Sequence, residues 1–152
     1  MAAYIRNKKA TFNYEILETF EAGVVLFGYE VKAIRAGKGK LDGGHVLIRG
    51  GEAYLVNSSV SYYQEANTPK GYDSERPRKL LLSKKQLAKL EVQTNQAGLT
   101  IVPISWYNKQ SKIKLEIALV RGKKKVDKRE TLKKRDVKRD IDRILKTEPF
   151  SR

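Results

Sequence analysis

Residues 99–120 read LTIVPISWYNKQSKIKLEIALV, and this stretch sets the class of fold. Two runs rich in β-branched and aromatic residues, Leu99–Tyr107 and Lys112–Val120, flank the polar residues 108–111, which is the pattern of a β-hairpin. In the second run charged residues alternate with apolar ones, so one face of the strand is expected to meet water. Pro103 has no backbone donor, which favours a bulge or an edge position there.

More strands are predicted before this hairpin. The residue pattern over 12–20 predicts a strand, which continues over 23–26 after a break at Ala22-Gly23. His45–Arg49 and Ala53–Asn57 flank Gly50-Gly51-Glu52, the signal of another hairpin. About five or six short strands predict a mainly β fold, a closed antiparallel barrel of the oligonucleotide-binding (OB) kind with two to three flanking helices.

Two helices are predicted among these strands. Ser83 and Gln86 have the spacing of a capping box, and the apolar positions that follow recur with helical spacing up to Gly98, a plausible left-handed stop. A shorter helix over 29–36 would turn Val31 and Ile34 inward and Glu30, Lys32 and Arg35 outward.

The composition favours a protein that meets polyanions. Lysine and arginine total 32 against 17 acidic residues, a net charge of +15 on 152 residues. Cysteine is absent and His45 is the single histidine, so thiol chemistry and histidine-pair metal sites are excluded and no cofactor or metal is expected. No apolar stretch is long enough for a membrane span, and the N-terminal residues lack the apolar segment of a secretory signal, so a cytoplasmic protein is expected.

The charge concentrates at the C-terminus. From Arg121 to Arg152 there are 14 basic and 6 acidic residues, so the last fifth of the chain carries +8 of the net charge. Its apolar content is too thin for a core. We therefore expect a folded body over residues 1–121 and a basic tail over 122–152, which is disordered when free and helical when docked on a polyanion.

Individual residues leave alternatives open. Any single lysine is more commonly a solvated surface residue than a ligand contact. The net charge of the whole chain is what favours binding of a nucleic acid. Tyr54, Tyr62, Tyr63 and Tyr107 could stack on unpaired bases or pack in the core. His45 could be a general base, although a structural role fits better because no partner motif follows it. Glu30 could cap its helix or accept hydrogen bonds from a base or sugar edge.

An ordered set of short motifs resembles the SsrA-binding protein (SmpB) family. The motifs run from residue 7 to about 143, and each is weak alone while the ordered set is specific. They are Asn7-Lys8-Lys9-Ala10, Glu21-Ala22-Gly23, Gly28-x-Glu30-Val31-Lys32, Arg35-x-Gly37-Lys38, Gly51-Glu52, Arg78-Lys79-Leu80-Leu81-Leu82, Gly98 to Val102-Pro103, Gly122-Lys123-Lys124, Asp127-Lys128-Arg129 and Arg135-Asp136.

The resemblance implies a six-stranded OB barrel without catalytic activity. It implies that the body grips the tRNA-like domain of transfer-messenger RNA (tmRNA) and accompanies it, with elongation factor Tu, to a stalled ribosome for trans-translation. The tail would then probe the vacant decoding centre and mRNA channel. Nothing in the sequence demands a dimer, so a monomer is expected.

The resemblance and the cationic clusters together select candidate contact residues. The candidates for RNA binding are Lys8, Lys9, Glu30, Lys32, Arg35, Lys38, Arg78, Lys79, Lys114, Lys123 and Lys124. The candidates for the decoding centre and channel are Asp127, Lys128, Arg129, Lys133, Arg135 and Arg139. Val126 stands where the family has a side chain that can stack, and valine has no flat face.

Two other functions are compatible with the composition. A ribosomal or nucleoid structural protein would bind structured RNA or duplex DNA without preferring a tRNA-like fold. An RNA-processing enzyme is disfavoured by the missing cysteine, the single histidine and the lack of paired carboxylates.

Overall fold

The structure is a computed structural model that describes residues 3–62, 64, 68–96 and 98–123. The predictions made for Tyr63, Lys124, Val126 and the tail residues from Asp127 to Arg139 therefore lie outside the described residues, as does the predicted behaviour of the tail.

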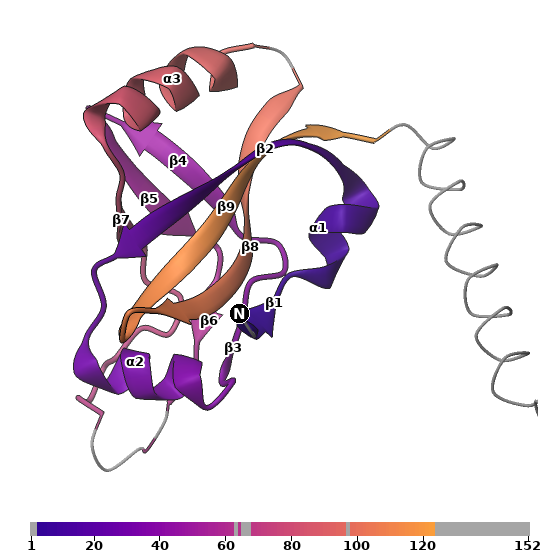
Figure 1. The fold of residues 1–152 in the computed structure, drawn as a ribbon. Helices are drawn as coiled ribbons and strands as arrows, with labels where there is room; N and C mark the ends of the chain where they lie inside the picture. Colours follow the sequence, from indigo (N-terminus) through magenta and orange to yellow (C-terminus); the bar gives the residue numbers. More distant parts are fainter. Residues whose placement is uncertain (1–2, 63, 65–67, 97, 124–152) are drawn as a thin grey trace, which may run out of the picture. The chain divides into compact units, whose positions relative to one another are not determined.

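The described chain is mainly β, as predicted (Figure 1). One antiparallel sheet holds seven strands in the order β1-β8-β9-β2-β7-β5-β4, rather than the six or so expected. The strands are β1 (Ala3–Arg6), β2 (Tyr14–Val24), β4 (His45–Arg49), β5 (Glu52–Val56), β7 (Arg78–Leu81), β8 (Leu99–Lys109) and β9 (Lys112–Gly122), with β3 (Gly39–Lys40) and β6 (Ser59–Val60) as a separate pair. The pairings among the described residues leave β1 and β4 as the outer strands.

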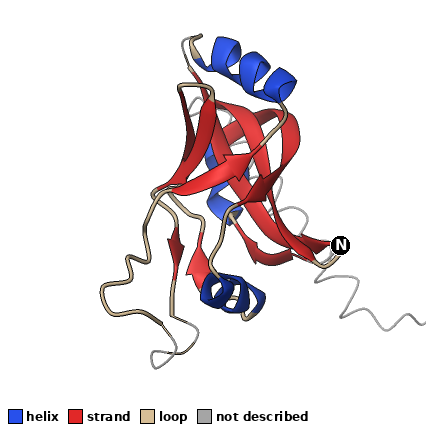
Figure 2. Cartoon of the chain, turned by 90° about the vertical axis from the view of Figure 1, so that its left-hand side faces the viewer, coloured by secondary structure: helices blue, strands red, loops and turns tan. Residues whose placement is uncertain are grey.

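The sheet curls around the larger of two apolar clusters; the helices α3 (Lys84–Thr94) and α2 (Gly28–Arg35) lie at its two ends, and the helix α1 (Lys8–Asn13) lies beside it (Figures 1 and 2). Trp106, Leu115 and Ile117 from the β8–β9 hairpin are fully buried in the larger cluster. Ala10 of α1 packs against Val102, Ala118 and Val120 in the smaller cluster. No helix in the described part of the chain is long and apolar enough to cross a membrane.

Both predicted hairpins are confirmed. β4 and β5 are joined by Gly50 and Gly51, whose φ angles of 59° and 76° suit a tight hairpin turn. β8 and β9 pair along their whole length, and the register shifts between Pro103 and Ser105, which is the bulge expected at the proline. β1 pairs with β8 only as far as Arg6 and Ser105, so among the described residues Pro103 has a strand partner on the β9 side alone, which agrees with the expected edge position.

The prediction for residues 12–26 is wrong at both of its boundaries. Residues 8–13 form α1, and the strand that follows runs through Gly23 without a break. Asn7 starts the helix through long-range bonds: its backbone N–H donates to the Ile104 carbonyl at 2.8 Å, and its side-chain Nδ2 donates to the Pro103 carbonyl at 2.8 Å. Local periodicity carries no information on such partners.

The capping box of α3 is confirmed, but the helix ends earlier than predicted. The Ser83 hydroxyl accepts from the Gln86 N–H, and the Gln86 side chain accepts from the Ser83 N–H, both at 3.2 Å. The helix stops at Thr94, whose hydroxyl donates to the Leu90 carbonyl at 2.8 Å. Gly98, with φ of 83°, instead turns the chain into β8.

Candidate nucleic-acid interface

Helix α2 carries two of the predicted cations to the surface. Ala33 and Ile34 are fully buried on its inner side, whereas Lys32 and Arg35 are exposed. Arg35 reaches the turn between β8 and β9, where its Nη2 donates to the Ser111 carbonyl at 3.2 Å. This bond ties the end of the helix to the hairpin that dominates the sheet.

A basic hollow of about 340 Å³ lies between α2, β2 and the start of β9. Arg35, Lys112 and Lys114 supply its cations, and Leu81, which is 53% exposed, supplies part of its apolar lining. Gly23 makes room for this arrangement, since a Cβ there would lie 3.2 Å from Leu81 Cβ and 3.7 Å from Lys114 Nζ. Cations beside an apolar surface can meet both a phosphate and the face or edge of a nucleotide.

Glu21 adds an acceptor near this hollow. It accepts a hydrogen bond from the Tyr107 hydroxyl at 2.7 Å, and Lys109 Nζ lies 3.2 Å away. The Tyr107 bond, followed by Lys109, holds the pKa of Glu21 below its usual value, so the carboxylate stays ionised. Burial and the same carboxylate raise the pKa of Tyr107. Glu21 can therefore accept from an amino or hydroxyl group of a ligand at neutral pH.

The prediction that Glu30 faces outward is wrong, because its side chain is fully buried in an ion network. Its Oε2 accepts from Arg78 Nη2 at 2.8 Å and from Arg76 Nε at 3.1 Å, and its Oε1 accepts from Arg76 Nη2. Oε1 also accepts from the Phe27 N–H at 2.9 Å, which confirms the capping role. The Tyr72 hydroxyl donates to Oε2 at 2.9 Å.

This network fixes the protonation states of its members. Burial would raise the pKa of Glu30, but the hydrogen bonds from Arg76 and Phe27 and the charge of Arg78 outweigh it and hold the pKa below its usual value. Burial, followed by the bond to Glu30, raises the pKa of Tyr72 to about 12. Glu30 and the equally buried Arg78 therefore join α2 to β7 from inside the fold.

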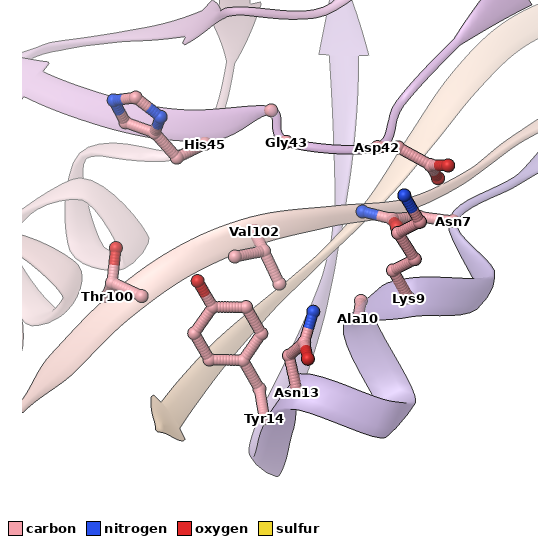
Figure 3. Close-up of a pocket in the computed structure, with 11 residues that line it drawn as sticks. Asn7, Lys9, Ala10, Asn13, Tyr14, Asp42, Gly43, His45, Thr100 and Val102 are labelled. Carbon is pink, nitrogen blue, oxygen red and sulfur yellow. The ribbon is translucent and has the colours of Figure 1, made fainter. Parts of the chain in front are cut away.

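A second hollow, of about 520 Å³, is lined by α1, β8 and the residues before β4 (Figure 3). Lys9, Tyr14, Asp42 and His45 line it, and His45 is half-buried at the start of β4. Asn7 holds this corner together, since its Nδ2 also donates to the Leu41 carbonyl at 3.3 Å. Across the described residues no cluster of histidine and carboxylate side chains could hold a metal ion.

The structure brings only some of the predicted RNA-binding residues together. Arg35 and Lys114 meet at the basic hollow, Lys32 lies one turn away on α2, and Lys9 belongs to the second hollow, which shares no lining residue with the first. The remaining described candidates are not in the lining of either hollow. Lys8 is exposed on α1, Lys38 is exposed after α2, Lys79 pairs with Glu52 at 3.2 Å, and Lys123 follows β9.

The predicted stacking tyrosines differ in their surroundings. The hydroxyl of Tyr54 donates to Glu52 and that of Tyr107 to Glu21, so both rings lie along the sheet beside carboxylates. Tyr62 is 47% exposed and packs against Tyr72. Tyr62 is therefore the most accessible of those that the structure describes.

A family model described as SmpB protein matches residues 4–147. The chain belongs to the SmpB family. An SsrA-binding protein of Microcystis aeruginosa is 51% identical over 140 residues, which cover 92% of this chain and 91% of that protein. The SsrA-binding protein of Mycoplasma mycoides is 50% identical over 135 residues, which cover 89% and 91%.

A solved structure from the SmpB family has the same fold. It is described as "tmRNA-SmpB: a journey to the center of the bacterial ribosome", and its chain is 42% identical with a TM-score of 0.66. The match covers 79% of this chain and 84% of that chain. The resemblance read from the ordered motifs is thus confirmed.

Sequence reasoning missed three residues at or near the basic hollow of this SmpB family member, namely Glu21, Leu81 and Lys112. Glu21 belongs to the motif Glu21-Ala22-Gly23, and its position two residues before Gly23 puts it on the same face of β2. Leu81 is the outward residue in the run Leu80-Leu81-Leu82, and strand alternation requires one leucine of that run to face out. This alternation is the sequence signal from which an exposed leucine beside Lys79 could have been predicted.

Proposed function

We propose that this chain binds the tRNA-like domain of tmRNA and accompanies it to stalled ribosomes in trans-translation. The observation that carries the proposal is the 42% identity, at a TM-score of 0.66, to a chain described as tmRNA-SmpB in the bacterial ribosome. The net charge of +15 agrees with an RNA partner. We assign the chain no catalytic step, and its place of action would be the cytoplasm, where ribosomes are.

The basic hollow is the proposed contact with the tRNA-like domain. Arg35, Lys112 and Lys114 would pair with phosphates, while Glu21 and Leu81 would meet the sugar and base edges of the same nucleotides. Lys32 and Lys38 would extend the contact along the backbone, and Lys8 and Lys9 would add a second point of attachment. Glu30 and Arg78 would act by positioning α2 rather than by touching RNA, because both are buried.

The remaining proposals carry over the roles that the resemblance to the SmpB family implies. The body over 1–121 would close into the OB barrel, and the tail over 122–152 would enter the ribosome. Asp127, Lys128 and Arg129 would probe the vacant decoding centre, and Lys133, Arg135 and Arg139 would follow the mRNA channel. Lys123 and Lys124 would bridge the two parts. Elongation factor Tu would join the delivery complex, with the protein as a monomer.

A competition binding assay at a fixed, near-physiological salt concentration tests the proposal. Labelled tRNA-like domain of tmRNA is bound to the protein and challenged with excess ordinary tRNA and with plain duplex RNA. We expect the complex to resist both competitors. Equal displacement by duplex RNA would contradict the proposal and favour a ribosomal or nucleoid structural protein.

Arg35→Glu is expected to weaken binding of the tRNA-like domain by roughly 1–3 kcal/mol, because it removes a cation from the basic hollow and adds a repelling charge. Filter binding or fluorescence anisotropy at one salt concentration measures the change. Lys89→Glu on α3 is the matched control, since it makes the same change of charge outside the lining of the hollow. An equal loss in both variants would show that binding follows net charge alone.

A further inference from the structure

An aromatic patch lies at the start of α2, and its rings are not part of the lining of the basic hollow. Phe27 stacks on Tyr29 with ring centroids 5.4 Å apart, Tyr29 meets Tyr72 edge-on at 5.2 Å, and Tyr72 packs against Tyr62 at 5.8 Å. Phe27 is 50% exposed, close to the exposure of Tyr62. Four adjoining rings on one surface are the kind of apolar patch that marks a binding site.

Arg76 gives this patch a cationic face. Its guanidinium carbon lies 4.4 Å from the centroid of the Phe27 ring. Its Nε donates to Glu30 Oε2 at 3.1 Å and its Nη1 to the Pro77 carbonyl at 3.3 Å. The N–H groups at the edge of the guanidinium donate these bonds, which fix the orientation of its plane. The Arg76 side chain keeps 23% of its surface exposed.

The ion network beside the patch is net positive, while the exposed carboxylates of Asp73 and Glu75 lie next to it in the chain. The single carboxylate of Glu30 is shared by Arg76 and Arg78, so the network retains one uncompensated positive charge. Lys32 is exposed one turn along α2 and lines, with Arg35, a shallow hollow of about 510 Å³. Gly28, between Phe27 and Tyr29, faces open space, since a Cβ there would meet no atom within 4 Å.

We propose that the aromatic patch (Phe27, Tyr29, Tyr62 and Tyr72, with Arg76) binds an unpaired nucleotide of single-stranded RNA. Bases stack on aromatic rings and on guanidinium planes, and this contact requires a base whose face is not covered in a duplex. The phosphate of that nucleotide meets Lys32. This inference goes beyond the proposed function, because it assigns a second contact surface that tolerates any base.

The test uses the full chain and a short single-stranded RNA with one fluorescent purine analogue. The matched ligand is abasic at that position too and therefore has the same phosphate charge. All other positions of both RNAs are abasic, because a patch that tolerates any base would otherwise bind a neighbouring one. We expect the RNA that carries the analogue to bind roughly tenfold more tightly than the abasic RNA, with quenching of the analogue on stacking. A Phe27→Leu/Tyr62→Leu variant is expected to bind both RNAs with the affinity of the abasic one.

Phe20→Leu is the control for loss of a ring elsewhere, since Phe20 lies on β2 under Lys89 and outside the aromatic patch. It is expected to keep the difference between the two RNAs. Equal binding of both RNAs by the unsubstituted protein, or an unchanged difference in the Phe27/Tyr62 variant, would overturn the proposal. Either result would leave the competition assay with the tRNA-like domain unaffected, so failure of the aromatic patch and failure of the proposed function are distinguishable.

Discussion

Replacing Glu30 by alanine is expected to lower the free energy of unfolding by about 3–5 kcal/mol, because it leaves buried positive charge without a partner. Arg78 is fully buried and has its counter-charge in Glu30, 2.8 Å away. The substitution also removes the acceptor for the Phe27 N–H at the start of α2. Urea denaturation of the variant and the unsubstituted protein measures the difference.

Glu18→Ala is the matched control for this prediction. Glu18 pairs with Lys89 at 2.8 Å, but both side chains are more than two-fifths exposed, at 41% and 47%. Exposed pairs contribute less than about 1 kcal/mol, so only a small loss is expected. Losses of equal size in the two variants would contradict a special role for the buried network.

The same network predicts a dependence of stability on pH. The folded state holds the pKa of Glu30 below the value of 4.5 that it has without partners. The stability it contributes is therefore complete above about pH 4.5 and is lost as pH falls through the lower, folded-state pKa. We expect the difference in unfolding free energy between the unsubstituted protein and Glu30→Gln to shrink as the solution is acidified. A difference that stays constant with pH would exclude an ionised Glu30 as its source.

The features that could be predicted from the sequence are those set by neighbouring residues. The turn at Gly50-Gly51, the capping box of Ser83 and Gln86, and the bulge at Pro103 each depend on backbone chemistry within a few positions. The β8–β9 hairpin follows from the alternation of apolar and charged residues over adjacent positions. Local rules therefore predict both hairpins correctly, although they misplace the start of β2 and do not predict β1 or β7.

The features that were missed depend on partners far along the chain. Glu30 reads as a surface residue of α2, and its burial follows from Arg76 and Arg78, 46 and 48 positions away. Asn7 starts α1 through the carbonyls of residues more than 90 positions away, a tie that overrides the strand-like pattern after it. The periodicity of a short sequence window cannot show that such distant residues pair with Glu30 or with Asn7.

The candidate site was predicted in part for the same reason. Exposed cations such as Lys32 and Arg35 can be assigned from charge and helical spacing, and both are exposed in the structure. The convergence of Arg35 with Lys114, and the place of Leu81 beside them, depends on how α2 meets the hairpin. Of the two arginines near β7, the sequence could not distinguish the buried Arg78 from the partly exposed Arg76.

Deleting residues Val126–Arg152 is expected to abolish tagging of stalled nascent chains while leaving affinity for the tRNA-like domain largely intact. The proposed contacts of the body, at the basic hollow, all lie before the deletion. The last strand, β9, ends at Gly122, and Lys123 is the last described residue. The shortened chain therefore keeps every strand of the seven-stranded sheet. The deletion removes the residues proposed to enter the decoding centre and channel.

Two measurements on the shortened chain distinguish the parts of this prediction. Its dissociation constant for the tRNA-like domain, taken at the salt concentration used for the full chain, should change little, apart from the electrostatic loss of a basic segment. A reconstituted tagging reaction on ribosomes stalled without message should give no tagged product. If the shortened chain loses most of its affinity, the tail rather than the basic hollow grips the RNA. If it still supports tagging, the decoding-centre role belongs to the body, where the second hollow, with Lys9, Tyr14 and His45, is the next surface to substitute.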